Sequence, residues 1–261
     1  MANNHPFHMV NNSPWPILNS LNLMNLILNI IMMMKMKFNY ILLIISLMIL
    51  IISMMMWWRD ILREGAFQGH HTFKVYKGLK ISMLLFILSE IMFFISFFWT
   101  FFHFSLSPEM EISNNWPPNN IKMINPFHIP LLNTMILLSS GATITWTHFS
   151  IIKKNYYKSF FSLMLTILMG IIFSYFQVIE YNWTEYSIND SVFGSIFFMA
   201  TGFHGFHVFI GTLFLCLNLI RLFKNQFNSI HHFSFEASAW YWHFVDVVWI
   251  YLYIFMYWWF F

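Results

Sequence analysis

Charged residues and cysteine are both scarce in this chain. Only 9% of its 261 residues are charged, whereas a soluble domain carries about 25%, so water alone does not account for the solvation of its surface. The single cysteine, Cys216, excludes a disulfide or a thiolate metal cluster within the chain. No internal repeat or low-complexity linker divides the sequence, and we interpret residues 1–261 as one membrane domain.

Hydrophobic and aromatic residues dominate instead, at 59% and 21%, with a mean hydropathy of +0.62. About 20 apolar residues cross a hydrocarbon core of roughly 30 Å, and the longest segments reach or exceed that length. The sequence therefore predicts an all-α polytopic membrane protein. Its seven transmembrane helices are expected at 16–34, 40–58, 76–105, 129–151, 158–180, 190–222 and 234–258.

The beginning of the sequence and its codon bias give indications of the cellular compartment of the protein. The first fifteen residues have neither a basic start nor an apolar run, so we expect no secretory signal peptide there. Residues with A/T-rich codons are abundant, and Met occurs in runs. This bias indicates an organellar genome and points towards an inner membrane.

Basic residues fall unevenly about the predicted spans. With seven alternating helices, ten lysines and arginines lie on one face and three on the other. The richer face receives Arg59, Arg63, Lys74, Lys77, Lys80, Lys153, Lys154, Lys158, Arg221 and Lys224, and the poorer face Lys35, Lys37 and Lys122. By the positive-inside rule the N-terminus lies on the inner side and the C-terminus on the outer. The acidic residues Glu109, Glu111, Glu180, Glu185 and Asp190, interpreted as loop residues, lie on the basic-poor face. The net charge of +3 gives no indication of nucleic-acid binding.

Four asparagines in the first predicted helix, Asn19, Asn22, Asn25 and Asn29, share one helical face. Carboxamides facing lipid are costly, so this stripe either packs on protein or faces a polar cleft. Drift towards Asn in an A/T-rich genome is the equally weighted alternative.

Two carboxyl groups fall inside predicted spans, where ionisable residues are functional candidates by default. Glu90 lies near the centre of the third segment without a basic residue in the same span. We expect a structural hydrogen bond slightly ahead of a role in a proton path. Asp246 lies three residues after His243, a spacing that favours a local structural pair.

The chain has twelve histidines, with His204 and His207 on one face of a span and His103, His148 and His243 in or near other spans. Paired histidines on membrane helices can ligate haem or copper. Gly202 and Gly205 flank His204, which favours close helix packing with histidine hydrogen bonds over ligation.

The segment 57–80 is the most polar stretch on the basic face, and we interpret it as a loop. Trp58 marks a membrane interface, and Arg63 and His71 provide groups that can hold lipid phosphates. These charges can equally be topology signals alone.

Long strings of residues resemble subunit III of cytochrome c oxidase along essentially the whole chain. They include HPFHMV, SPWP, WWRD, FQGHHT, WPP, LLSSG, TWTH, TGFHG and AWYWHFVDVVW. The resemblance implies a seven-helix subunit of the mitochondrial inner membrane, arranged as two plus five helices with a V-shaped cleft that holds phospholipids. Its N-terminus would lie on the matrix side and its C-terminus on the intermembrane side.

That resemblance also implies the function. The oxidase reduces oxygen to water with electrons from cytochrome c and pumps protons, and haem and copper belong to subunits I and II. Subunit III would carry no cofactor except bound phospholipid, would stabilise the core and would support proton uptake. By position, Glu90 matches a buried carboxyl that reacts with a hydrophobic carbodiimide. The positions that match residues near lipid are Trp58, Arg63, Glu64, His71, Arg221, His231 and Phe233.

Two other classes of function remain as alternatives. A stand-alone proton or ion transporter would use Glu90, Asp246 and the histidines, but the inverted repeats that transporters often show are not visible. A haem-bearing electron carrier would require its own absorption band.

Overall fold

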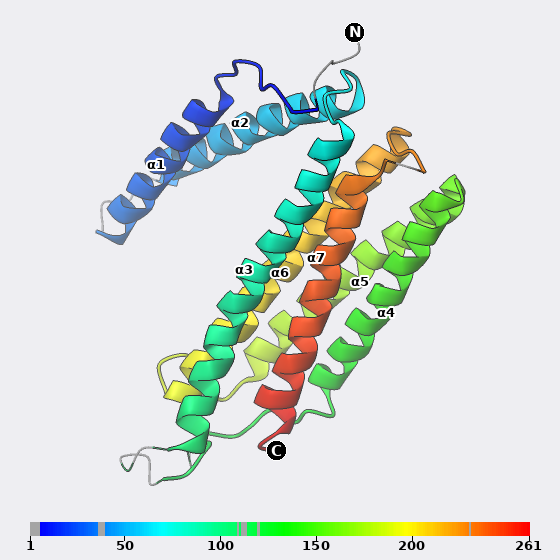
Figure 1. Cartoon of the computed structure of the whole chain (residues 1–261). Helices are drawn as coiled ribbons and strands as arrows, with labels where there is room; N and C mark the ends of the chain where they lie inside the picture. Colours follow the sequence, from blue (N-terminus) through cyan, green and yellow to red (C-terminus); the bar gives the residue numbers. More distant parts are fainter. Residues whose placement is uncertain (1–5, 36–39, 109, 111–113, 119–120, 230) are drawn as a thin grey trace. The chain divides into compact units, whose positions relative to one another are not determined.

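The computed structural model describes residues 6–35, 40–108, 110, 114–118, 121–229 and 231–261. Lys37, Glu109 and Glu111 of the predicted charge pattern lie outside these residues. The described chain is all-helical, which confirms the predicted class (Figure 1). Its helices are α1 Trp15–Met34, α2 Tyr40–Ala66, α3 Phe73–Leu106, α4 Ile129–Ile152, α5 Tyr156–Trp183, α6 Val192–Phe223, α7 Phe233–Leu252 and the π-helix η2 Tyr253–Trp258.

The segment 57–80 is mostly helical, which corrects the prediction of a loop there. Helix α2 continues to Ala66 and α3 already begins at Phe73, so only residues 67–72 connect them. Hydropathy falls where a helix leaves the hydrocarbon, but backbone hydrogen bonding does not stop there. Most polar residues of this segment therefore belong to the ends of α2 and α3, beyond the apolar parts of these helices.

The chain divides into two compact units, residues 1–79 and 80–261. We call them the N-terminal unit and the C-terminal unit. The N-terminal unit contains α1, α2 and the first turns of α3, and the C-terminal unit contains the remaining helices.

Hydrogen bonds between side chains join α1 and α2 in the N-terminal unit. Ser53 donates to Asn19 Oδ1 at 2.7 Å and accepts from Asn22 Nδ2 at 3.1 Å. Near the same end of α1, Trp15 Nε1 donates to Asp60 Oδ2 at 2.7 Å. Asn19 and Asn22 of the predicted stripe thus pack on protein.

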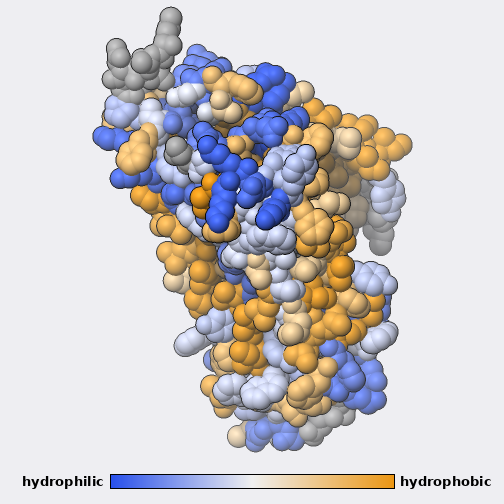
Figure 2. Space-filling view, turned by 90° about the vertical axis from the view of Figure 1, so that its right-hand side faces the viewer, coloured by the Kyte–Doolittle hydropathy of each residue, from blue (hydrophilic) through white to orange (hydrophobic). Residues whose placement is uncertain are grey.

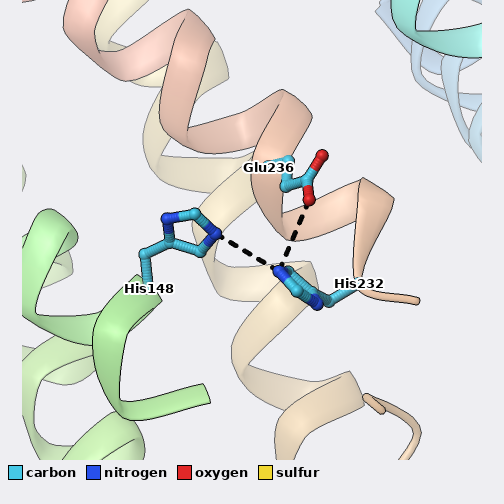
Figure 3. Close-up of side chains that lie close together, drawn as sticks. All are labelled: His148, His232 and Glu236. Atoms are coloured by element: carbon cyan, nitrogen blue, oxygen red, sulfur yellow. Dashed lines mark hydrogen bonds and ion pairs between the residues drawn. The ribbon is translucent and has the colours of Figure 1, made fainter. Parts of the chain in front are cut away.

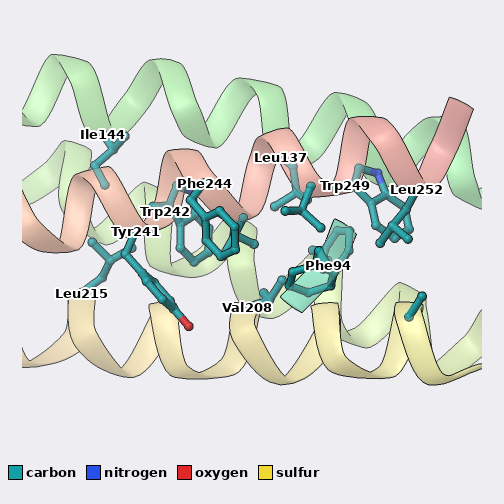
Figure 4. Packing of buried hydrophobic residues seen from close by; sticks show 14 of the residues in the cluster. Phe94, Leu137, Ile144, Val208, Leu215, Tyr241, Trp242, Phe244, Trp249 and Leu252 are labelled. Atoms are coloured by element: carbon teal, nitrogen blue, oxygen red, sulfur yellow. The ribbon is translucent and has the colours of Figure 1, made fainter. Parts of the chain in front are cut away.

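Aromatic side chains fill the core of the C-terminal unit, where α4, α5, α6 and α7 run alongside one another (Figures 1 and 4). Trp242 of α7 is fully buried, and its Nε1 donates to Ser140 Oγ of α4 at 2.8 Å. Gly170 of α5 and Gly211 of α6 make room for this indole. A Cβ added at these glycines would lie 2.7 Å and 3.0 Å from its ring atoms.

Six of the described helices, α1 to α6, are long and apolar enough to cross a membrane. Helix α7 is not among them, although the sequence predicts seven spans. The difference follows from its surroundings, because 12 of its 20 residues are buried, whereas α1 buries one. A helix covered by protein can carry polar and amphipathic side chains that a lipid-facing helix excludes. On the face drawn in Figure 2, hydrophobic side chains cover much of the middle and hydrophilic ones gather towards the ends.

Candidate functional site

The intramembrane carboxyl of Glu90 lies against a histidine of another helix. Glu90 Oε2 of α3 is 2.9 Å from His207 Nε2 of α6, and these side chains are 24% and 9% exposed. The aromatic rings of Phe93, Phe94 and Tyr241 surround the imidazole. The structure thereby joins two residues that the sequence singled out separately.

The second ring nitrogen of His207 fixes how this pair shares protons. His207 Nδ1 is 2.6 Å from the carbonyl oxygen of Phe203, which can only accept, so Nδ1 carries a hydrogen. The Nε2–Oε2 contact then contains one proton, held either by the carboxyl group or by the imidazole. The pair can exchange this proton internally, and it connects α3 to α6.

His204 also bonds to a neighbouring helix, through Nε2 to the carbonyl oxygen of Val245 on α7 at 3.1 Å. The glycines beside it play no part in that contact. A Cβ added at Gly202 or Gly205 would meet no atom within 4 Å. The predicted close packing at these glycines is therefore wrong, whereas the histidine hydrogen bonds are present. The spacing of small residues does not show whether two helices meet there, because a small residue permits a close contact without requiring one.

Asp246 lies 3.8 Å from His243 Nδ1, measured from its Oδ2 atom, as the spacing of three predicts. The carboxyl is buried against α4, since a Cβ on Gly141 would lie 2.9 Å from Asp246 Oδ2. This local pair is thus part of the α4–α7 contact.

A buried polar cluster on α5 and η2 was missed by the sequence analysis, which placed Glu180 in a loop. Glu180 is a helical residue of α5 and is 2% exposed. Its Oε1 accepts hydrogen bonds from Tyr257 Oη at 2.6 Å and from Gln177 Nε2 at 3.3 Å. The spacing of Gln177 and Glu180 at three residues was the available signal, but nothing in the sequence links them to Tyr257.

The predicted lipid residues of the N-terminal unit lie at the end of α2 and in the connection to α3. Trp58 is 49% exposed, and Arg63 NH1 is 3.9 Å from Asp60 Oδ1. Glu64 Oε2 is 3.3 Å from His8 Nε2, and the ring of His71 packs against Gly65. These groups present both an exposed indole and an exposed guanidinium.

The remaining predicted lipid residues, Arg221, His231 and Phe233, lie in the C-terminal unit where α6 ends and α7 begins. The Arg221 guanidinium bonds to Ser234 Oγ and to Gln226 Oε1 at 3.3 Å. Its Cζ also lies 5.0 Å from the ring centre of Phe227. Among the described residues no carboxylate lies within ion-pair distance of Arg221.

One group of side chains has the composition of a metal site. His148, His232 and Glu236 each offer a ligand atom, and these atoms all lie within 4.8 Å of one another. His148 was considered as a ligand candidate from the sequence, but the two other members were not linked to it. They come from the end of α4 and the beginning of α7, which only the fold brings together.

These features define a multi-pass membrane protein whose intramembrane polar residues connect its helices. The family model described as cytochrome c oxidase subunit III matches residues 5–261. Proteins named cytochrome c oxidase subunit 3 are similar along almost the whole chain. That of Rhipicephalus sanguineus is 54% identical over 98% of this chain and 99% of its own length. Those of Osphranter robustus and Drosophila melanogaster are 52% and 51% identical, each over 98% of this chain and 97% of their own length.

The chain therefore belongs to the cytochrome c oxidase subunit III family. Together with the six apolar helices, this membership indicates a multi-pass protein of the inner membrane within an oxidase complex. The alternative of a stand-alone transporter finds no support in these comparisons.

Proposed function

We propose that this chain acts as a non-catalytic subunit of a proton-pumping cytochrome c oxidase, bound to subunits I and II. Oxygen reduction at haem and copper takes place in those partners, and this subunit stabilises the core and supports proton uptake. It lies in the mitochondrial inner membrane with its N-terminus on the matrix side, its C-terminus on the intermembrane side, and α7 as a seventh span.

The use of the intramembrane histidines supports a role without redox chemistry. His207 bonds to Glu90 and to the Phe203 carbonyl, and His204 bonds to the Val245 carbonyl. These hydrogen bonds occupy three of the four ring nitrogens on α6 and give them a function between helices. The Glu90–His207 pair is the observation on which the proposal depends most, because it gives the intramembrane carboxyl a partner and a defined proton.

A Glu90 variant in the purified complex tests this function. Glu90→Gln keeps a hydrogen-bond donor for His207 Nε2, so we expect the haem spectrum and the rate of oxygen reduction to remain at their unmodified values. The chain should co-purify with subunits that contain haem and copper, and should show no haem absorption after its dissociation from them. Loss of the haem spectrum in Glu90→Gln would contradict the non-catalytic role, as would a haem band in the dissociated chain.

The same proposal includes phospholipid binding at the basic ends of the helices. Arg221 is partly buried and bonds to neutral partners, so a phosphate would supply its missing counter-charge. Arg63 and Trp58 would bind a headgroup in the same manner at an interface. In the proposed single membrane domain, two plus five helices would enclose these lipids in a V-shaped cleft.

Lipid binding can be tested with two arginines of one helix. We expect Arg63→Gln to reduce the phospholipid that co-purifies with the complex, measured by native mass spectrometry. Arg59→Gln is the matched control, because Arg59 lies closer to Asp60 Oδ1, at 3.0 Å, than Arg63 does, at 3.9 Å. Arg221→Gln should also reduce the phospholipid that co-purifies, independently of Arg63→Gln. Equal lipid content in all variants and in the unmodified complex would refute this part of the proposal.

A further inference from the structure

His148, His232 and Glu236 converge where α4 ends and α7 begins (Figure 3). His148 lies on the last turns of α4, His232 precedes α7, and Glu236 lies in its first turn. His232 is 5% exposed, and the side chain of Glu236 is 12% exposed. Neither the Glu90–His207 pair nor the proposed oxidase function uses this cluster.

The distances between the ligand atoms suit a small metal ion. His148 Nε2 and His232 Nε2 are 3.2 Å apart, and His232 Nε2 is 3.4 Å from Glu236 Oε1. Ligand atoms in a tetrahedral zinc site, with bonds of about 2.0–2.1 Å, are separated by about 3.3 Å. Two edges of such a tetrahedron are therefore already formed.

A backbone contact places a hydrogen on one ring nitrogen of His232. Its Nδ1 lies 3.1 Å from the carbonyl oxygen of Asn228, which accepts the Nδ1 hydrogen. With Nδ1 bonded in this way, Nε2 is the ring nitrogen that faces His148 and Glu236, and in the neutral imidazole it carries the lone pair. A backbone carbonyl in this position is a frequent outer partner of a metal-binding histidine, because it holds the ring and its tautomer.

Glu236 is held from its other side. Lys80 Nζ of α3 lies 2.8 Å from Glu236 Oε2. This ion pair engages Oε2, while Oε1 is turned towards the imidazoles. In the neutral tautomer, His232 Nε2 and Glu236 Oε1 are both acceptors and face each other at 3.4 Å. A cation between them removes this repulsion.

We propose that His148, His232 and Glu236 form a binding site for a divalent transition-metal ion of the zinc class. Two imidazole nitrogens and one carboxylate oxygen suit such an ion better than magnesium or calcium, which prefer oxygen ligands. Three protein ligands leave a fourth position for water. Because the ligands come from two helices, a bound ion fastens α4 to α7.

Zinc binding to the intact oxidase complex tests the proposal. The complex is purified in mild detergent, treated with a chelator, dialysed and titrated with Zn²⁺ by calorimetry, and its metal content is then measured. We expect the unmodified complex to bind one equivalent more than a complex with His148→Gln. His243→Gln is the matched control, since His243 also lies beside a carboxylate but belongs to no group of three ligand residues in the described part of the chain. This control should retain the equivalent.

Thermal unfolding separates a metal site from a hydrogen-bonded cluster. Zn²⁺ should raise the unfolding temperature of the unmodified complex and of His243→Gln, and leave that of His148→Gln unchanged. If His148→Gln weakens assembly of the chain, His148→Cys provides the second variant. It should restore one bound equivalent and favour Cd²⁺ over Zn²⁺, because thiolate is a softer ligand. Equal Zn²⁺ uptake and equal thermal shifts in the unmodified complex and in His148→Gln would overturn the proposal.

Discussion

Helices of the N-terminal unit meet through polar side chains, whereas those of the C-terminal unit meet mainly through aromatic ones. The buried residues of α1 and α2 are Asn19, Ser46 and Ser53. The C-terminal unit instead buries large side chains such as Trp242 and Trp249, with polar pairs between them. Lipid tails are as apolar as Leu, so moving an apolar side chain from lipid to protein gives little driving force. Two helices can be joined by hydrogen bonds, and a larger bundle gains more from close packing.

The largest effect is expected where the aromatic packing is tightest. Gly170→Ala places a Cβ 2.5 Å from Thr212 Cγ2 and 2.7 Å from Trp242 Cη2. Helices α5, α6 and α7 must then separate, at a cost of about 1–3 kcal/mol. The unfolding temperature of the purified complex, together with retention of this chain on native gels, measures the loss. Gly205→Ala is the control, because its Cβ meets no atom within 4 Å. Similar losses in both variants would mean that the close packing at Trp242 does not determine the stability of the complex.

The second effect concerns a polar pair inside the aromatic unit. Glu90→Leu leaves His207 Nε2 without its partner, and His207 is only 9% exposed. An unpaired buried group costs about 1–2 kcal/mol, which should lower the unfolding temperature of the complex. Glu90→Gln keeps the contact and should change this temperature little. If both variants lose the same amount, the carboxyl acts through its charge and not through this hydrogen bond.

A smaller effect should follow from disrupting the N-terminal unit at its central hydrogen bonds. Ser53→Ala removes the hydroxyl that bonds to both Asn19 and Asn22. Hydrogen bonds between membrane helices contribute about 0.6 kcal/mol on average, so the two together should contribute about 1 kcal/mol. Amide hydrogen exchange in α1 should then be about five times faster. Ser20→Ala on α1 is the control, since the Ser20 hydroxyl donates to the carbonyl of Ile17 within its own helix. Unchanged exchange in Ser53→Ala would show that apolar contacts hold the two helices together.

The smallest effect is expected for an ion pair at the surface. Lys122 Nζ lies 2.7 Å from Glu185 Oε2, and these side chains are 77% and 61% exposed. Lys122→Ala should change the unfolding free energy by about 0–1 kcal/mol, and the difference should vanish at high salt. Unfolding temperatures at low and high ionic strength measure it. A stability loss that persists at high salt would mean that this contact acts through packing and not through charge.

Helix type and approximate position could be predicted from the sequence because apolar length is a local property. The ends were harder to predict, since α2 and α3 continue through residues such as Arg59 and Lys74 that hydropathy assigns to a loop. The same local argument misassigned Glu180, whose neighbours became visible only when α5 met η2.

The candidate sites were harder still to predict, because their residues are far apart in the sequence. Glu90 and His207 could each be singled out as ionisable residues in apolar segments, but they are 117 positions apart. His148 and His232 are 84 positions apart and belong to no short motif. The His243–Asp246 pair, at a helical spacing of three, was accessible to local geometry. Contacts between helices depend on packing that one sequence does not encode locally.

The modest hydropathy of α7 has a consequence for biogenesis. Among the described α-helices it is the last to leave the ribosome, and it carries Glu236, His243 and Asp246. Charged residues make membrane insertion of an isolated helix unfavourable by about 2.5–3.5 kcal/mol each at its centre. The helices that bury α7 precede it in the chain and can already be in the bilayer when it arrives. In the proposed seven-span topology, insertion of α7 would be coupled to tertiary assembly, so that a packing defect in α4, α5 or α6 would act first on the topology of the nascent chain.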